Sequence, residues 1–173
     1  MNIEIANLDN LTEDEKETFN RLVEKANRKS KVFKPEKNKN YYFITANGVV
    51  EYQNWDEDCY DDACYELGNC FETEEQAEFA IEKQKVYMEL KRYALEHNER
   101  EIDWSNIYQA KWCIIFNHIE NLLQIRNYTC NEQIGQIYFT SKEIAQNAIQ
   151  KIGEDRIKKY LFEVKDVEQN TNG

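Results

Sequence analysis

The chain has 173 residues, and its 33 acidic side chains outnumber its 22 basic ones, which gives a formal net charge of -11 at pH 7. This length leads us to expect one compact domain rather than a multidomain enzyme. The composition, 41% hydrophobic and 13% aromatic, excludes an intrinsically disordered chain. The acidic excess argues against a general nucleic-acid binder, because it repels phosphate unless the basic residues are segregated.

The sequence contains no feature of a membrane or exported protein. No run approaches the roughly 18 uncharged apolar residues of a bilayer span, and the start of the chain lacks the basic region of a signal peptide. We therefore expect a cytoplasmic protein with reduced cysteines.

The cysteines and histidines do not form a recognisable catalytic or metal-binding set. The cysteine spacing is C-x4-C-x5-C followed by two distant cysteines. It lacks the closely spaced cysteine pairs that coordinate one zinc ion. His97 and His118 fall on different predicted elements, although a Cys–His pair that meets only in the fold remains an alternative. We predict no catalytic residue, no metal site and no cofactor. The five cysteines are Cys59, Cys64, Cys70, Cys113 and Cys130.

The first 40 residues divide into a helix and a basic segment. Thr12 and Glu15 form a capping box, which predicts a helix from about Glu13 to Asn27 within an N-terminal region 1–30. Its apolar stripe should pack across the rest of the protein. Residues 25–39 hold seven basic residues and one acid, and residues 31–40 are interpreted as an exposed basic connector. The stripe consists of Phe19, Leu22, Val23 and Ala26.

Residues 41–100 predict a first strand-hairpin-plus-helix unit. Two β-rich runs, 41–45 and 49–53, flank Asn47-Gly48, a pair typical of tight hairpin turns. An acidic stretch, 55–66, and a short strand, 68–71, should follow. A capping box at Thr73 then predicts a helix to about His97. The expected buried stripe of this helix is Ala77, Ala80, Ile81, Tyr87, Met88, Ala94 and Leu95.

Residues 101–166 repeat this order, and the tail 167–173 should be flexible. Strands are expected at 111–119, 122–126 and 135–139, followed by a capped helix that Gly153 ends and a short helix from 154 to 160. Six identities recur at a spacing of 68 residues between 71–83 and 139–151. We interpret them as an internal repeat, with convergence of two capped strand-to-helix junctions as the alternative. The predicted fold class is α+β, with two pseudo-repeated ββ(β)α units, an N-terminal helix and a short C-terminal helix.

Three segments also carry a resemblance to known proteins. They are Tyr41-Tyr-Phe-Ile44 with the following Asn47-Gly48, the run 68–77 and the run 135–145. On these segments the chain resembles small accessory proteins of phages and prophages of Gram-positive bacteria. The matching residues are caps, turns and aromatics, so the resemblance transfers no catalytic residue. It implies a mobile-element context, where small acidic proteins often inhibit a host protein, including restriction or RNA-guided nucleases.

Acidic residues are concentrated in one segment. Residues 51–82 hold twelve acids and neither lysine nor arginine. Three glutamates four residues apart would line one helical ridge at about 6 Å spacing, similar to a strand of phosphates. Such a surface predicts a basic partner attracted by electrostatic steering, whereas a merely solvated acidic face is the alternative. The predicted partner-binding residues are Trp55, Asp56, Glu57, Asp58, Tyr60, Asp61, Asp62, Glu74, Glu75, Glu78 and Glu82.

The same acids do not match the pattern of a calcium-binding loop or of a two-carboxylate hydrolase. The run from Asp56 begins like a calcium loop, but Asp61 replaces the required glycine and Leu67 replaces the bidentate glutamate. A two-carboxylate hydrolase needs a cleft to separate the pKa values of its acids.

We therefore predict a non-enzymatic phage or prophage accessory protein. It would bind a host protein with a basic surface, such as a nuclease, and inhibit a defence system or nucleic-acid enzyme. No membrane contact and no direct nucleic-acid binding are expected. Two alternatives stay open: a sponge for a small-molecule nucleotide signal with a pocket between the halves, and a nucleic-acid regulator that uses the basic connector.

Overall fold

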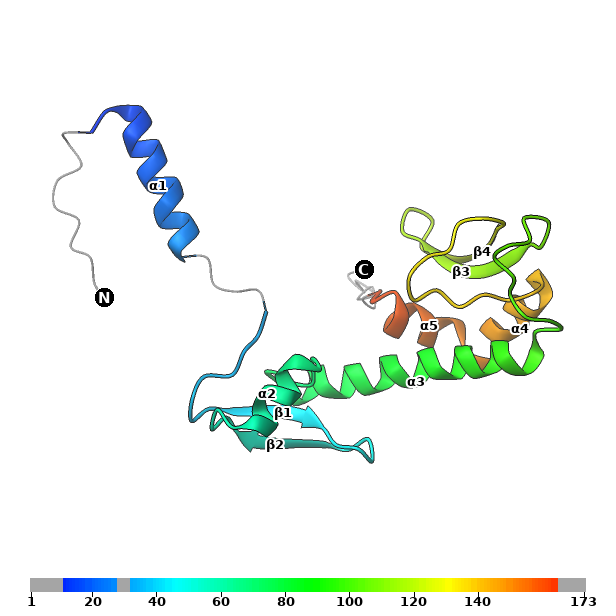
Figure 1. Cartoon of the computed structure of the whole chain (residues 1–173), viewed down its shortest axis with the longest axis horizontal. Coiled ribbons are helices and arrows are strands. Elements are labelled where there is room, and N and C mark those ends of the chain that lie inside the picture. The colour runs from blue at the N-terminus through cyan, green and yellow to red at the C-terminus, as the bar shows by residue number, and fades with distance from the viewer. Residues whose placement is uncertain (1–10, 28–31, 165–173) are drawn as a thin grey trace, which may run out of the picture.

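The computed structural model describes residues 11–27 and 32–164 and confirms the α+β fold (Figure 1). The predicted N-terminal and C-terminal helices are both present. The boundaries of the predicted helices and hairpin strands agree with the structure within one or two residues, but the strands predicted at 68–71 and 135–139 are reduced to isolated bridges and one helix was not predicted. The elements in chain order are α1 (Glu13–Asn27), β1 (Asn40–Ile44), β2 (Val50–Asn54), α2 (Cys59–Glu66), α3 (Glu74–His97), β3 (Lys111–Asn117), β4 (Leu122–Tyr128), α4 (Lys142–Ile152) and α5 (Glu154–Leu161).

Unit one, which we define as residues 33–72, is built on the antiparallel hairpin of β1 and β2. The expected third strand is reduced to one bridge, in which Phe71 and Tyr42 exchange two backbone hydrogen bonds. The helix α2 lies within the predicted acidic stretch 55–66, for which no helix was predicted. Asp58 caps it by accepting hydrogen bonds from the backbone nitrogens of Tyr60 and Asp61, as N-cap aspartates do.

Unit two, which we define as residues 98–164, repeats this arrangement. β3 and β4 form an antiparallel hairpin, and Phe139 makes a single bridge to Trp112. Ser141 then caps α4, as Thr73 caps α3 after the bridge of unit one. The order of hairpin, bridge and capped helix therefore occurs twice, which confirms the pseudo-repeat.

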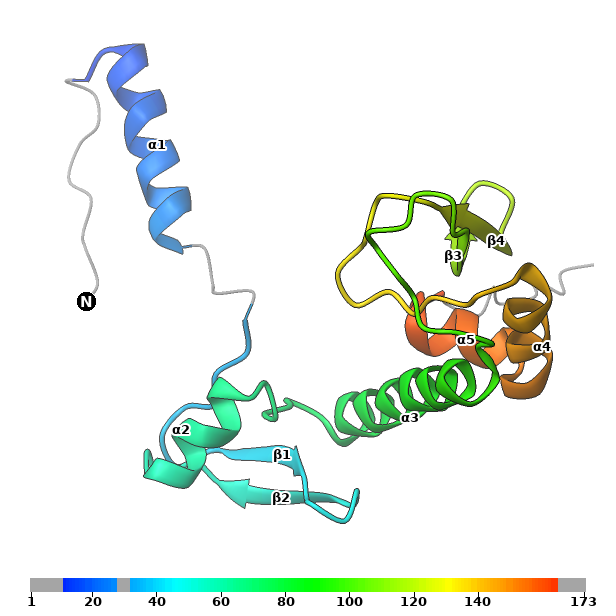
Figure 2. The same ribbon diagram turned by 45° about the vertical axis from the view of Figure 1, so that its right-hand side comes forward.

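Helix α3 connects the two units and contributes to both (Figures 1 and 2). The core of unit one is small and aromatic, with Tyr41, Phe43 and Trp55 buried beside Cys64. The larger core of unit two includes the C-terminal half of α3. The second half of α3 thus packs with unit two, although the predicted division at residue 100 assigns the whole helix to the first unit. The buried residues of this larger core are Val86, Leu90, Ala94, Ile114, Phe139, Ala145, Ala148, Ile149, Ile152 and Ile157.

The N-terminal 40 residues differ from the prediction in two ways. Helix α1 does not lie across the units but stands apart from both (Figures 1 and 2), and Leu22 of its apolar stripe is 56% exposed. The connector is not exposed throughout, since Pro35 is buried and Phe33 packs against the core of unit one. The predicted flexible tail 167–173 lies outside the described residues.

No helix in the described part of the chain combines the length and apolar character needed to cross a bilayer.

Candidate functional site

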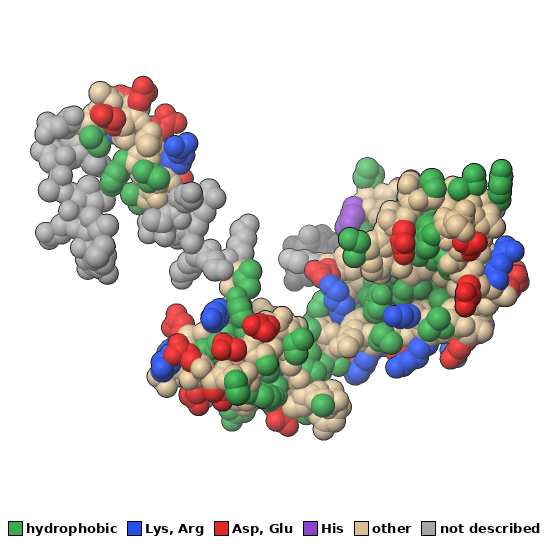
Figure 3. Space-filling view, viewed as in Figure 1, with side chains coloured by type: hydrophobic (Ala, Val, Ile, Leu, Met, Phe, Trp, Pro, Cys, Tyr) green, Lys and Arg blue, Asp and Glu red, His purple; other side chains and the backbone are tan. Residues whose placement is uncertain are grey.

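The acidic segment forms a surface over unit one and the first turns of α3. Figure 3 shows acidic side chains gathered on this part of the molecule, whereas basic side chains follow the edge along α3 below unit two. Residues 33–82 hold thirteen acids and three bases, but residues 83–164 hold eleven acids and twelve bases. The negative charge is therefore segregated in space. We define the acidic face as nine exposed carboxylates without an ion pair among the described residues: Glu51, Asp56, Asp58, Asp62, Glu66, Glu72, Glu74, Glu75 and Glu78.

Four of the predicted partner-binding residues are either buried or already form ion pairs within the chain. Asp61 and Trp55 are 1% and 2% exposed, so neither can touch a partner. Glu57 pairs with Lys37 at 2.7 Å. Glu82 pairs with Lys85 on its own helix and with an arginine of α5. The predicted ridge of three glutamates therefore ends at Glu78, because α5 packs beside the third position.

Asp61 is the centre of a buried hydrogen-bond network in unit one. Its carboxylate accepts hydrogen bonds from the Tyr41 hydroxyl at 2.9 Å, the Gln53 amide at 2.9 Å and the Asp56 backbone nitrogen at 2.7 Å. Burial alone would raise the pKa of Asp61, but these donors outweigh it and hold the pKa below its ordinary value. Burial and the contact with Asp61 raise the pKa of Tyr41. This carboxylate therefore joins α2 to the hairpin.

Lysines of the connector cover one edge of the acidic surface. The Lys34 ammonium lies 5.7 Å from the centre of the Trp55 ring and 5.1 Å from that of Tyr65, which is cation–π geometry. The hydrogen bond to Glu57 raises the pKa of Lys37. This edge of unit one is thus partly neutralised, while α2 and the start of α3 keep their charge.

Large apolar side chains are exposed among these acids. Tyr60, one of the predicted partner-binding residues, is 50% exposed and meets Phe43 edge-on. Tyr52 on β2 and Leu67 after α2 are also exposed. Aromatic side chains set beside charge are typical of protein interfaces.

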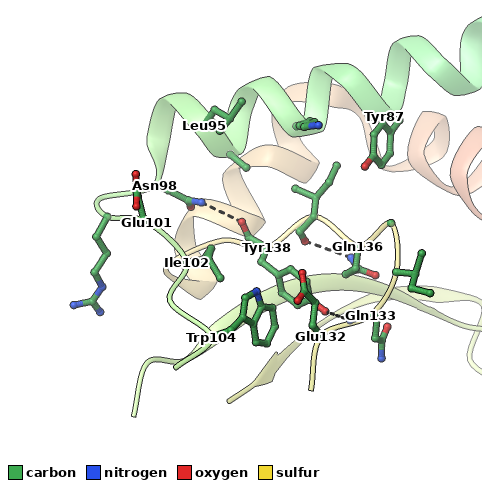
Figure 4. Close-up of a pocket in the computed structure, with 16 residues that line it drawn as sticks. Tyr87, Leu95, Asn98, Glu101, Ile102, Trp104, Glu132, Gln133, Gln136 and Tyr138 are labelled. Atoms are coloured by element: carbon green, nitrogen blue, oxygen red, sulfur yellow. Dashed lines mark hydrogen bonds between the residues drawn. The ribbon is translucent and has the colours of Figure 1, made fainter. Parts of the chain in front are cut away.

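A groove on unit two was not predicted from the sequence. It has a volume of about 900 Å³ and lies between the second half of α3 and the segments 100–104 and 132–138. Figure 4 shows Leu95 on α3, Asn98 at the C-cap of this helix, and Ile102, Trp104 and Tyr138 from the segments that line the other side. The groove has no sequence signal of its own, because loops distant in the chain form two of its walls.

Lys111 is fully buried behind this groove. Its ammonium donates to the backbone carbonyl oxygens of Asn106, Gln109 and Thr129 at 2.9 to 3.1 Å. It also lies 5.1 Å from the centre of the Trp104 ring. The three donors of one ammonium group thus hold the loop that carries Trp104 against the end of β4.

Two of the cysteines are buried or half-buried thiols, and both histidines pack against aromatic rings. Burial raises the pKa of Cys70 and of Cys113 to about 11, which keeps both thiols protonated. The His97 ring stacks on Tyr93, and His118 packs edge-on against a phenylalanine. Within residues 11–27 and 32–164, no three histidine, cysteine or acidic side chains are grouped to hold a metal ion.

Comparisons of the chain with protein-family models, with curated proteins and with solved structures found no match.

Proposed function

We propose that the chain is a non-enzymatic protein that binds a basic surface of another protein through the acidic face of unit one. A basic nucleic-acid enzyme of a host cell is the partner class that this charge suits, and occupation of its basic surface would inhibit it. The resemblance to phage and prophage accessory proteins agrees with such a role.

One observation carries the proposal: nine exposed carboxylates have no ion pair among the described residues. Acids on a merely solvated surface are commonly interspersed with bases, yet here the neighbouring bases lie on the later turns of α3, on unit two and in the connector. The concentrated negative potential would speed association with a positive partner. Exposed Tyr52, Tyr60 and Leu67 supply apolar contact area beside the charge.

Charge-removing variants test this proposal. Replacing Glu66, Glu74 and Glu78 with glutamine removes three charges from the acidic face and keeps helix propensity. The variant should fold normally and associate with the partner about tenfold more slowly or worse, because steering is lost. Affinity capture from an extract of the organism that encodes the chain identifies the partner, and stopped-flow mixing measures the association rate.

The matched control replaces three exposed glutamates outside the acidic face with glutamine: Glu96 at the end of α3, and Glu99 and Glu143 in unit two. This control has the same net charge as the test variant and should associate at nearly the parental rate. Association of the parent should slow as salt rises, since screening acts over about 8 to 10 Å. Equal loss in both triple variants would show that net charge matters but the acidic face does not.

A further inference from the structure

The hairpin of unit one has one covered edge and one open edge. On the β1 side, Tyr42 exchanges two backbone hydrogen bonds with Phe71, and the side-chain amide of Asn69 bonds both backbone groups of Ile44 at 2.8 and 2.9 Å. No such contact occurs on the β2 side among the residues that the structure describes. We propose that this open edge of β2 accepts an extended, basic segment of the partner protein as an added strand, an inference that rests on the proposed function of the acidic face.

The register of the hairpin identifies the open backbone groups. Tyr42 directs its N–H and C=O groups toward Phe71, so Tyr52, directly opposite in the register, directs its own away from β1. Val50 and Asn54, two residues to either side, point the same way because the pattern alternates along the strand. The backbone groups of these three residues form no hydrogen bond within the described chain. We call Val50, Tyr52 and Asn54 the β2 edge.

Strand β2 lacks the devices that commonly protect an open edge. Natural sheets protect such edges with lysine, proline, bulges or a covering element. β2 contains neither lysine nor proline, and its five residues pair with β1 without a bulge. Figures 1 and 2 show β2 as the outer strand of unit one, with no other described element along its free side. An added strand therefore meets no obstacle from the described residues.

The charges around the β2 edge determine which strand fits. The only charged residue of β2 is Glu51, and residues 40–82 contain neither lysine nor arginine. Glu51 stands opposite Phe43, whose ring meets Tyr60 of α2 edge-on, so Glu51 lies on the side of the sheet that faces α2. A lysine or arginine of an added strand can pair with it there, because cross-strand neighbours interact directly. A second copy of the chain is disfavoured, because it would bring two acidic faces together.

The other side of the sheet offers an aromatic surface to the added strand. Tyr52 is 67% exposed, and its ring centre lies 6.2 Å from that of Tyr42. Val50 shares this side, because alternate residues of a strand point the same way. In strand addition the backbone provides affinity, and alternate side chains provide specificity. The expected segment therefore alternates basic and apolar residues.

The equivalent edge of unit two has the opposite charge. Asn127 stands opposite Trp112, which forms the bridge to Phe139, so Asn127 corresponds to Tyr52 of unit one. Its neighbour Arg126 is exposed and would repel a basic strand. Because the two edges share their backbone pattern but differ in charge, the edge of β4 is a matched control.

A synthetic peptide tests the β2 edge directly. The probe is an octapeptide of alternating lysine and valine. One control peptide alternates glutamate and valine, and the other is the lysine–valine peptide with every backbone nitrogen methylated. At saturation the probe should slow hydrogen exchange of the Val50, Tyr52 and Asn54 amides at least about tenfold, and neither control should do so.

Three results of this experiment would overturn the proposal. The first is the absence of protection with the lysine–valine probe. The second is equal protection by the methylated peptide, which would show attraction by charge alone. The third is slow exchange of these amides in the parent without peptide, which would show that another segment or a second copy already covers the edge.

Substitutions at one position separate the backbone contact from the side chain. Tyr52→Pro removes an N–H that has no partner in the hairpin, a position where edge strands tolerate proline. Tyr52→Ala removes the same side chain and keeps the N–H. Tyr52→Pro should bind the probe at least about tenfold more weakly than Tyr52→Ala, whereas Asn127→Pro should bind it like the parent. Equal binding by the two Tyr52 variants would refute the added strand; if Tyr52→Pro does not fold, the exchange pattern of the parent decides.

Kinetics with the captured partner distinguish this proposal from the proposed function. The triple glutamine variant of Glu66, Glu74 and Glu78 should slow association, because it weakens steering. Tyr52→Pro should instead speed dissociation at least about tenfold relative to Tyr52→Ala, because contacts at the interface are lost. Parental association of the triple variant would contradict the role of the acidic face. Equal dissociation of the two Tyr52 variants would overturn the added strand alone.

Discussion

Tyr41 and Lys111 occupy equivalent positions in the two units, and both side chains are completely buried. Each comes immediately before the strand residue that forms the bridge of its unit, Tyr42 or Trp112. The Tyr41 hydroxyl donates to Asp61 in α2, whereas the Lys111 ammonium donates to three loop carbonyl oxygens. The same position thus holds a different element in each unit: α2 in unit one, and the loop that carries Trp104 in unit two.

Because of this difference, the stability of the two units should respond differently to pH. In unit one a carboxylate is the acceptor, so the network depends on the ionisation of Asp61. In unit two the acceptors are backbone carbonyl oxygens, which do not titrate.

Replacing Asp61 with alanine should strongly destabilise the protein. The substitution leaves the Tyr41 hydroxyl, the Gln53 amide and the Asp56 backbone nitrogen without this acceptor, and each buried unpaired donor costs about 1 to 3 kcal/mol. We expect a loss of about 3 kcal/mol or more in the free energy of unfolding, measured by urea denaturation. The exposed neighbour is the control, and Asp62→Ala should cost less than about 1 kcal/mol. Similar losses for both variants would contradict the network.

The contribution of Asp61 should depend on pH with a definite sign. Its pKa in the folded protein lies below the ordinary value of 3.8, so the unfolded state binds the proton more readily. The stabilisation is therefore complete above about pH 4 and is lost as pH falls through the lowered pKa. The difference in unfolding free energy between the parent and Asp61→Asn should be constant from about pH 5 to 7 and shrink below pH 4. A difference that grows on acidification would contradict this assignment.

Local signals account for the parts of the fold that the sequence predicts. Asn47-Gly48 marks the first hairpin turn, where Gly48 has a φ of 77° that favours glycine. Thr73 and Ser141 mark the starts of α3 and α4 through their side-chain caps. These signals depend on neighbouring residues in the chain, so they can be recognised without a tertiary structure.

The missed features depend on contacts between distant residues. Helix α2 buries only Asp61 and Cys64, so its inward face includes a carboxylate that any hydropathy pattern counts as exposed. Leu95 was expected to be buried but is 75% exposed, because the loops opposite it leave the groove open. Trp55 and Asp61 were predicted to touch a partner but are buried by contacts between distant residues. The burial of Asp61 depends on hydrogen-bond donors whose position beside it cannot be recognised from the sequence.

Replacing Lys111 with methionine should loosen the loop that carries Trp104. Methionine fills similar volume but leaves three carbonyl oxygens without their donor, and we expect a loss of roughly 2 to 4 kcal/mol in unfolding free energy. Hydrogen exchange should rise first in residues 101–110. The control is Lys142→Met at an exposed position, which should change stability by less than about 1 kcal/mol. Unchanged exchange in this loop would show that the ammonium does not hold it.

Phe71 and Phe139 make equivalent bridges but should differ in energetic importance. Phe139 is completely buried in the large core of unit two, whereas Phe71 is half-buried and lines a groove beside α3. Truncation to alanine should therefore cost about 3 to 5 kcal/mol at Phe139 and clearly less at Phe71, because less apolar area is lost and a smaller cavity is created. Urea denaturation measures both, and Tyr108→Ala, at a 91% exposed position, is the control. Equal losses at the two bridges would show that the units are energetically as well as topologically equivalent.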